Sequence, residues 1–537
     1  MTYKKTIYIL YVALFLYFVI AAATLINSSQ GISFDPGLCI KMVDNGYKHI
    51  PFNHYSHPSP KNLNADESEI VTWWSPGQFA IPLLIQKCFG VKVSIALKLL
   101  IIICLLIAGL GTYRLFNLLI SNKNSIDRNN DLTKIIVLVF LLFTIAQPFF
   151  WGSLFVYDGG GILMLAYCPW FIYWVVKINR INVYILLQLL IAAIFGFFLK
   201  TSFTSIFAGA LLFLFLSKSI SPDRSLKNQD FKKIARNGIY LGGIFIIYIL
   251  MIRAFLDQNL NISDSSTGIR IQPRILFYPI AAPLLGLFSL DFLNKTFYWI
   301  IASAFILPLY YLVLKSNHIS ILYKYALISF ISTCVLFYSF LYFLNLDVSY
   351  ELRHYRIITI LLTPAVFISF RRFGWGKYFA GILMVMYTAI NIYHFSKSFS
   401  SASKENEPIY ELSGIPSGYP EDLIMKIHNL DNLKDNGRDI FYFESDDEPS
   451  VALEIRNNRV LVSNNFVNFH FNNALRFKPT IYFGHNGGEI YLIYTPLQFK
   501  KDSVAGFTLF DKYKKFDKIY QVKGYEIYRA IASGNNR

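Results

Sequence analysis

Two carboxylates lie in polar turns beside apolar stretches, where an acidic side chain is expensive to place and needs a reason. Asp35 follows the first apolar stretch in the sequence FDPG, and Asp158 precedes three glycines in YDGGG. A carboxylate in such a place can act as a general base or as a ligand of a metal ion. Structural roles are the alternative, because Asp-Pro-Gly is typical of turns and Asp158 could cap the following helix. Two acids on separate loops at the same end of a bundle make a joint site more plausible than either acid alone.

Positive side chains occur near the same predicted helix ends. Five of them could hold the phosphate of an anionic ligand: Lys200, Arg270, Arg274, Arg353 and Arg356. Membrane proteins usually carry an excess of Lys and Arg in their cytoplasmic loops. An anionic ligand therefore explains positive charge on the outer side better than topology does. Arginine also matches phosphate oxygens bidentately. The alternatives are a lysine that snorkels at a helix end and an ion-pair network around Glu351.

Residues 28–78 separate the first two apolar helices and are too polar to lie in lipid. Loops of this length are usually functional or disordered, and the aromatic and Pro-Gly content argues against disorder. We interpret this segment as the floor of an active site at the outer membrane surface. Seven side chains could contact the substrates of such a site, as acceptor or donor of a transferred group. They are Asp66, Glu67, Glu69, Trp73 and Trp74 within the segment, with His354 and Tyr355 before a late span. The histidines of the segment fit no strong metal-binding spacing.

The composition indicates which elements must position these residues. Of the 537 residues, 54% are hydrophobic and only 15% are charged, whereas soluble domains carry about 25% charged residues. The chain is therefore a polytopic membrane protein. The net charge of +17 is explained by basic cytoplasmic loops and contact with anionic lipids, and no compact basic patch has the spacing of nucleic-acid recognition. Five cysteines without a CxxC pair predict neither a disulfide framework nor a zinc site.

About eleven stretches are apolar enough to cross a membrane. They lie near residues 7–27, 92–119, 134–151, 160–177, 182–199, 203–217, 237–256, 296–314, 325–344, 357–370 and 378–395. Residues 78–90 are too short to cross, and we expect an amphipathic helix on the membrane surface. Residues 275–291 are interrupted by Pro279 and Pro283, so we predict a re-entrant or interfacial helix there. Residues 7–26 read as the first span and not as a cleavable signal peptide.

Lysine and arginine in the short loops set the expected orientation. Lys4 and Lys5, the basic segment 218–236 and Arg371 with Arg372 are predicted to be cytoplasmic. Counting through the spans then places the loop 28–78 and the C-terminal segment 396–537 on the outer side. For a bacterial protein this means an inner-membrane location, with the N-terminus in the cytoplasm and the C-terminal domain in the periplasm.

The chain divides into a membrane module, residues 1–395, and a C-terminal domain, residues 396–537. Beyond residue 396 the polar content rises and the apolar runs shorten to strand length. Strands are predicted at 441–445, 459–463, 489–494 and 525–531, and a helix at 420–433. A domain of about 140 residues has a normal size. The fold class is therefore a polytopic α-helical membrane protein with a soluble α/β domain at its C-terminus.

The layout of residues 1–400 resembles the GT-C superfamily of integral membrane glycosyltransferases. The resemblance rests on the order and sidedness of several features and on no single motif. These features are Asp35 with Gly46-Tyr47 in the first outer loop, Ser75-Pro76-Gly77 and Pro82 before the second span, Asp158 before the fourth, Lys200 between the fifth and sixth, Arg353-His354-Tyr355 and Pro364 around a late span, and the soluble C-terminal domain.

The resemblance implies an inverting glycosyltransferase similar to mannosyltransferases and aminoarabinose transferases. It would move a hexose or pentose from a polyprenyl-phosphate donor to a saccharide, lipid or protein acceptor on the outer face. Asp35 would be the catalytic base, and Asp158 would position the acceptor or, with Asp35, a divalent cation such as Mg or Mn. The five cations would hold the phosphate of the lipid carrier.

Two other classes use similar layouts. A transporter or flippase of lipid-linked saccharides would also have many spans, but it should show internal repeats and broken helices at the membrane midplane. A polymerase of lipid-linked saccharides uses the same donors. The polar residues of this chain cluster instead at the predicted outer ends, which favours the transferase.

Overall fold

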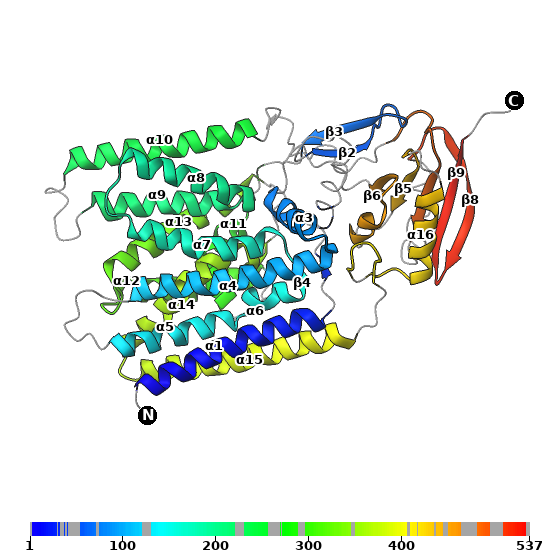
Figure 1. The fold of residues 1–537 in the computed structure, drawn as a ribbon. Coiled ribbons are helices and arrows are strands. Elements are labelled where there is room, and N and C mark those ends of the chain that lie inside the picture. Colours follow the sequence, from blue (N-terminus) through cyan, green and yellow to red (C-terminus); the bar gives the residue numbers. More distant parts are fainter. Residues whose placement is uncertain are drawn as a thin grey trace.

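The computed structural model describes most of the chain. The described residues are 3–28, 31–32, 37, 40, 54–70, 75–120, 130–220, 230–255, 269, 271–287, 296–344, 350–404, 409–415, 417–433, 437–443, 449–462, 481–494 and 509–532. They form a helical bundle with a smaller domain at one end, and the N-terminus lies at the opposite end of the bundle (Figure 1). The predicted division of the chain at residue 396 into a membrane module and a C-terminal domain stays a prediction.

Long apolar runs fold into helices here because a helix satisfies its own backbone hydrogen bonds without water. The long helices of the bundle are α1 (Tyr3–Asn27), α4 (Val93–Ile120), α5 (Asn130–Ile145), α7 (Gly160–Lys177), α8 (Val183–Leu199), α9 (Phe203–Ser219), α10 (Phe231–Phe255), α12 (Thr296–Lys315), α13 (Ile321–Phe343), α14 (Arg356–Ser369) and α15 (Gly376–Lys404). Within the described residues, six helices are long and apolar enough to cross a membrane, or seven if one bent pair counts as a span. Each of the eleven predicted spans lies on a helix, and the polytopic helical fold class is confirmed.

One predicted span is broken in the structure. The stretch 134–151 forms α5 and then α6 (Pro148–Trp151), which meet at a bend of 65°. Pro148 has no N–H for the helix and its ring crowds the preceding turn. The side chain of Gln147 is buried at the break, where its Oε1 accepts a hydrogen bond of 3.1 Å from Asn391 Nδ2 of α15. The break therefore places a polar contact inside the bundle.

Two short helices were anticipated beside the spans. The 15-residue helix α11 (Pro273–Leu287) contains both predicted prolines and packs against α12, α13 and α14. At about 22 Å it is shorter than the hydrocarbon core of a bilayer. The helix α3 (Gly77–Phe89) corresponds to the predicted surface helix at 78–90. It reaches from the interior of the bundle end toward the C-terminal domain (Figure 1).

The long first loop contains strand pairs that the sequence analysis did not anticipate. The strand β1 (Gly31–Ile32) pairs in parallel with β4 (Val156–Tyr157), which follows the short 3-10 helix η2 (Gly152–Leu154). The strands β2 (His54–Pro58) and β3 (Asp66–Ile70) form an antiparallel hairpin. The first pair joins the loop to the segment between η2 and α7. The hairpin extends toward the C-terminal domain (Figure 1).

The C-terminal domain is a five-stranded mixed sheet with the strand order β6-β5-β7-β9-β8. Its elements are α16 (Glu421–Leu433), β5 (Ile440–Phe443), η7 (Pro449–Glu454), β6 (Arg459–Val462), β7 (Ile490–Tyr494), β8 (Tyr513–Val522) and β9 (Tyr525–Ala532). The predicted helix and four strands are confirmed. The sequence analysis missed β8, the partially exposed edge strand with several lysines, because its charge masks the apolar alternation.

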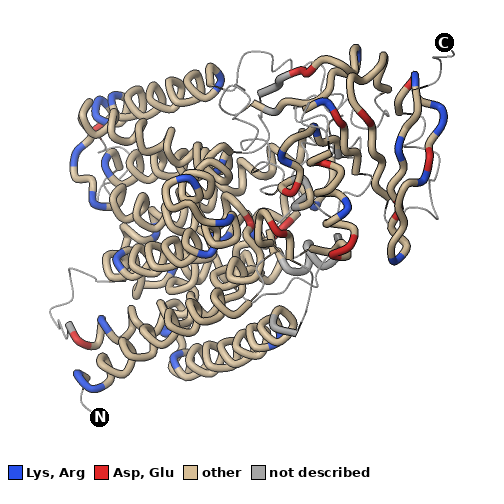
Figure 2. The backbone as a smooth tube through the Cα atoms, turned by 45° about the vertical axis from the view of Figure 1, so that its right-hand side comes forward, with Lys and Arg blue, Asp and Glu red and all other residues tan. Residues whose placement is uncertain are grey.

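Charged residues are distributed unevenly over the backbone (Figure 2). The bodies of the bundle helices are almost free of them, while acidic and basic positions gather at helix ends and over the C-terminal domain (Figure 2). This distribution fits a bundle whose middle lies in lipid.

Candidate active site

Asp158 lies in the turn between β4 and α7, where its two carboxylate oxygens make different contacts. Oδ1 accepts hydrogen bonds from the Ile162 amide at 3.1 Å and from Ser153 Oγ at 3.4 Å. Oδ2 lies 2.5 Å from Arg356 Nη1, and both side chains are largely buried, with 12% and 14% exposed. Asp158 therefore both caps α7, as its structural interpretation predicted, and forms a buried ion pair.

Three successive glycines allow the backbone to pass close to this ion pair. Gly159 has a φ of 64°, a conformation that side chains disfavour. A Cβ at Gly160 would lie 2.9 Å from the Leu199 carbonyl oxygen, and one at Gly161 would lie 2.3 Å from Asp158 Oδ2. The glycines thus bring the start of α7 against both the carboxylate and the end of α8.

Lys200 lies directly after α8 and faces the same group of charges. Burial lowers the pKa of its ammonium to about 8, although the carboxylate of Asp158 acts in the opposite direction. Burial also disfavours ionisation of Asp158, but the charges of Arg356, Lys200 and Arg353 outweigh it and leave the pKa of that carboxyl below its ordinary value. The structure therefore brings the predicted residues Asp158, Lys200, Arg353 and Arg356 into one electrostatic cluster.

The arginines of the cluster enter from the 3-10 helix η5 (Leu352–Tyr355) and the first residue of α14. The guanidinium of Arg353 pairs with the carboxylate of Glu351, as the ion-pair interpretation predicted. Arg356 has a second donor, Nε, that is buried and has no hydrogen-bond partner among the described residues. Together with Lys200 these arginines give three cations against the carboxylates of Asp158 and Glu351. The cluster keeps one surplus positive charge and an unused donor, which suits an anionic ligand.

An aromatic layer next to the cluster holds the other predicted residues of this end. Tyr355 is fully buried, and its ring centroid lies 4.9 Å from that of Tyr338. His354 stacks on the same Tyr338 ring at 5.5 Å. The guanidinium of Arg274 lies 4.0 Å from the ring centroid of Tyr350, a cation-π geometry. His354 and Tyr355 are therefore packed side chains that support the cluster.

Gln78 is a residue of this site that the sequence analysis missed. Its side-chain Oε1 accepts a hydrogen bond of 3.2 Å from the Gly160 amide, and its carbonyl oxygen accepts one of 2.6 Å from the Tyr157 hydroxyl. These bonds lock α3 onto the turn that carries Asp158. The signal available in the sequence was a polar residue, buried here, directly after Ser75-Pro76-Gly77 at the start of an apolar helix.

Several predicted residues lie outside the described residues: Asp35, Arg270, Trp73 and Trp74. For Glu69 the structure describes the backbone of β3 only. The pairing of β1 with β4 nevertheless bears on Asp35, because Ile32 stands opposite Tyr157 in parallel register. The chain segments that lead to the two predicted catalytic acids thus run side by side in the same direction.

Asp66 and Glu67 lie apart from the charge cluster. Asp66 Oδ1 accepts a hydrogen bond of 3.1 Å from Arg459 Nη1, and Arg459, buried at the start of β6, also donates to the Leu63 carbonyl oxygen. Glu67 accepts a hydrogen bond from the Ser59 hydroxyl within the same hairpin. In the structure Asp66 joins the first loop to the C-terminal domain, whereas Glu67 bonds within the hairpin, and a contact of either acid with the acceptor stays a prediction.

The predicted divalent cation has no preformed site among the residues that the structure describes. They contain no group of three or more His, Cys, Asp or Glu side chains that could hold a metal ion. Asp158, one of the two predicted ligands, is paired with Arg356. The need for a metal stays a prediction, and no step below depends on one.

An apolar groove of about 500 Å³ lies on the outside of the bundle between α7 and α8. It is lined by Tyr167, Trp174, Gln188, Ile191, Ala192 and Phe195. The Tyr167 hydroxyl donates a hydrogen bond of 2.8 Å to the Ala192 carbonyl oxygen and fixes the spacing of the two helices. Since α8 ends immediately before Lys200, the groove leads along this helix toward the charge cluster.

Comparison with known proteins identifies the fold. No family model and no curated protein matches the sequence. The structure is similar to the crystal structure of ArnT from Cupriavidus metallidurans in the apo state, with a TM-score of 0.53, 10% sequence identity and 99% of each chain covered. At this identity the likeness concerns the fold. The chain therefore has the same overall fold as this ArnT structure.

Proposed function

We propose that the protein is a membrane glycosyltransferase that moves a sugar from a polyprenyl-phosphate donor to an acceptor at the outer membrane surface. The observation that carries this proposal is the partly buried cluster of Lys200, Arg353 and Arg356 around Asp158, which has a surplus of positive charge. Such a cluster is costly at the end of an apolar bundle unless an anion compensates it. The GT-C fold supports the same class of reaction.

The phosphate of the donor is assigned to the cations of the cluster. Arg356 presents a buried Nε donor that has no partner among the described residues, and Lys200 makes no ion pair among them. Both groups can therefore turn to phosphate oxygens without losing Asp158 as a neighbour. Arg274 remains a further candidate, as does Arg270, which lies outside the described residues.

The lipid chain of the donor is assigned to the groove between α7 and α8. The lining is almost wholly apolar and lies on a lipid-facing surface, where Ile191 is 68% exposed and Phe195 is 49% exposed. A chain in this groove would keep contact with the bilayer while its phosphate reaches the turn after α8. An apolar groove beside a charge cluster suits a ligand with one charged end and one long apolar end.

The reaction needs one bond to form and one to break at the anomeric carbon of the sugar. A hydroxyl or amine of the acceptor attacks this carbon, and the bond from the carbon to the phosphate oxygen breaks. The electron pair stays on the phosphate, which the cations stabilise as it departs. The proton of the acceptor passes to a carboxylate acting as general base. Attack from the face opposite the phosphate inverts the anomeric centre.

The two predicted acids receive different roles. Asp158 is engaged by Arg356, Ile162 and Ser153 and has a lowered pKa, so it is a weak proton acceptor and suits positioning. Asp35 is the proposed base; β1, which ends three residues before it, pairs in parallel with β4, which ends directly before Asp158. The sugar and the acceptor are left open by the geometry.

The location of the site at the outer membrane surface is proposed from the bundle end at which it lies and from the basic residues that mark the cytoplasmic side. The cluster, the first-loop hairpin and the C-terminal domain gather at the bundle end opposite the N-terminus (Figure 1). With basic residues marking the cytoplasmic side, this end faces outward, which in a bacterial inner membrane is the periplasm.

Transfer of radiolabelled sugar from polyprenyl-phosphate donors by the purified full-length protein tests the proposal. The wild type is compared with Asp35→Asn, Lys200→Gln and the control Asp131→Asn, whose carboxylate lies on α5 in a 4.0 Å contact with Lys134. We expect transfer by the wild type and the control, and loss of transfer in the other two variants. Full activity of Asp35→Asn would move the base elsewhere, and no transfer from any donor would overturn the proposed reaction.

A further inference from the structure

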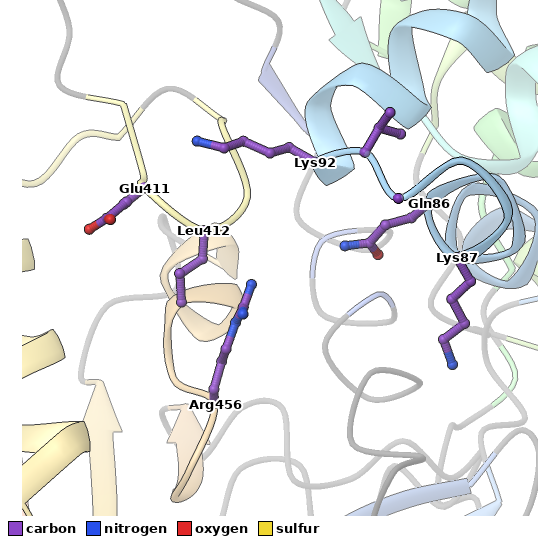
Figure 3. Close-up of a pocket in the computed structure, with 8 residues that line it drawn as sticks. Gln86, Lys87, Lys92, Glu411, Leu412 and Arg456 are labelled. Carbon is purple, nitrogen blue, oxygen red and sulfur yellow. The ribbon is translucent and has the colours of Figure 1, made fainter.

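A second polar cavity of about 780 Å³ lies between the membrane module and the C-terminal domain. One wall is the turn from α3 to α4, and the other comes from the start of the C-terminal domain and the segment before β6 (Figure 3). It is lined by Gln86, Lys87, Gly90, Val91, Lys92, Glu411, Leu412 and Arg456. Neither the charge cluster nor the lipid groove shares any of these residues.

The two walls are held together by hydrogen bonds. The Ser94 amide, in the first turn of α4, donates to the Ser413 carbonyl oxygen at 3.0 Å. The carboxylate of Glu454 is buried and accepts from the Leu412 amide at 3.0 Å and the Ser413 amide at 2.9 Å. His428 Nε2 lies 2.9 Å from the same carboxylate. The cavity is thus framed by ordered backbone on both sides.

The charges around the cavity are predominantly positive. Lys92 and Arg456 extend from opposite walls, and the amide of Gln86 lies to one side of them, on the wall that α3 forms (Figure 3). Lys87 adds a third cation. Among the described residues of the lining, the only acid is Glu411, whose carboxylate is directed away from the opening (Figure 3). Its side chain is 77% exposed, and its carboxylate lies 3.6 Å from His428 Nδ1. Lys92 and Arg456, one on each wall, favour an anionic ligand.

The helix α3 places this cavity at the level of the membrane surface. Leu84 and Phe89 are 62% and 70% exposed on α3, beside Lys87. Exposed apolar side chains next to a lysine are typical of a helix that lies at the boundary of the bilayer. The groups at this level that carry phosphate are lipid headgroups.

We propose that this cavity binds the phosphate of a membrane lipid headgroup, which joins the C-terminal domain to the membrane module. Lys92 and Arg456 bind the phosphate from the two domains, and Gln86 donates to it from the wall that α3 forms. The headgroup bridges the walls because each of them supplies one of the cations. The site is separate from the donor site, since α3 carries Gln78 at one end and Gln86 near the other, about 12 Å apart along the helix.

Binding to the purified full-length protein in a neutral detergent tests the proposal, with Lys200→Gln as the background so that the donor site contributes little. Dihexanoyl phosphatidic acid is the probe, and dihexanoyl phosphatidylcholine and inorganic phosphate are the comparison ligands. The pocket variant Lys92→Gln/Arg456→Gln is compared with Lys514→Gln/Lys515→Gln, which removes the same charge from exposed positions of β8. A conservative variant, Lys92→Arg/Arg456→Lys, keeps the charges.

We expect the phosphatidic acid to bind about tenfold more weakly to the pocket variant, because two charge-assisted contacts are lost. The β8 variant and the conservative variant should bind like the background protein. Equal binding by the pocket and β8 variants would overturn the proposed site. Binding of inorganic phosphate as tight as that of the lipid would overturn the assignment to a lipid headgroup.

Discussion

Arg356 Nη1 lies 2.5 Å from Asp158 Oδ2 and connects the first residue of α14 to the turn before α7, across 198 residues of sequence. Both side chains are largely buried, so neither charge is well hydrated. This contact holds two distant helix ends in one position and sets the place of the other cations. The predictions below begin with it.

Removing both members of this pair should destabilise the protein by less than the sum of the two single removals. Asp158→Asn leaves a buried guanidinium without its counter-charge, a change that costs about 3–5 kcal/mol in other proteins. The double variant Asp158→Asn/Arg356→Gln removes the stranded charge, so its loss should be smaller than the sum of the two single losses. Thermal unfolding of the four proteins in detergent measures this, and strictly additive losses would contradict a direct pair.

Donor binding should weaken as the pH rises from 7 to 9. The pKa of Lys200 is lowered by burial to about 8, so its ammonium is mostly charged at pH 7 and mostly neutral at pH 9. If only the charged form holds the phosphate, the Kd should rise about tenfold over this range. Lys200→Arg stays charged and should bind with little pH dependence. A wild-type Kd that is constant over the range would exclude Lys200 from the phosphate site.

A methyl group at Gly161 should disturb the ion pair without unfolding the bundle. Its Cβ would lie 2.3 Å from Asp158 Oδ2 and 3.0 Å from Arg356 Nη1, so Gly161→Ala should reduce kcat/KM for transfer by about tenfold or more. The matched control is Gly242→Ala in α10, where a Cβ meets nothing within 4 Å. That variant should be fully active and slightly more stable, by about 0.5–1 kcal/mol, since alanine favours helices. Equal activities of the two variants would argue against the site.

Filling the groove between α7 and α8 should affect long donors selectively. Ala192→Trp places a large ring among the lining residues, so kcat/KM should fall about tenfold for a long polyprenyl donor. A short donor of two isoprene units has little chain to place there and should react at its normal rate. The control is Leu187→Trp, on an exposed position of α8 outside the lining. An equal effect on both donors would show that the groove is not the chain site.

The contact of the C-terminal domain with α4 should depend on pH through His428. The hydrogen bond to Glu454 raises the pKa of His428 above its ordinary value of 6.5. The charged imidazole therefore contributes stability fully below pH 6.5, and this contribution is lost as the pH rises through the raised pKa. Burial opposes ionisation of Glu454, but His428 and the Leu412 and Ser413 amides outweigh it and lower the pKa of its carboxyl. The contribution of the charged Glu454 carboxylate to stability is complete above pH 4.5, the ordinary pKa of that group, and is lost as the pH falls through the lowered pKa.

Limited proteolysis near residues 409–415 measures this effect across pH. The wild type should be cleaved faster above the raised pKa of His428 than at pH 6. His428→Gln should show no such change over the same range, because its amide does not titrate. A wild type that is cleaved at the same rate throughout would mean that the charge of His428 does not hold this segment.

The sequence by itself determined the membrane architecture and the kinds of residues at the site. Apolar runs of span length must form helices in lipid, because only then are their backbone groups satisfied, and all eleven predicted spans lie on helices. Charged side chains such as Asp158, Lys200 and Arg356 stood out for the same reason. Their chemical types pointed to a phosphate-bearing ligand before any fold was known.

Only the tertiary structure decided which of these residues act together. Asp158 and Arg356 are 198 positions apart, and sequence spacing carries no information on a contact between different helices. Asp66 appeared equivalent to the other acids, yet it binds Arg459 of the C-terminal domain. Gln78, Lys92 and Arg456 were unremarkable in the sequence and gained their roles from the packing of α3 and the C-terminal domain. Local pattern fixes secondary structure and burial, whereas these pairings depend on long-range packing, which no short stretch of sequence encodes.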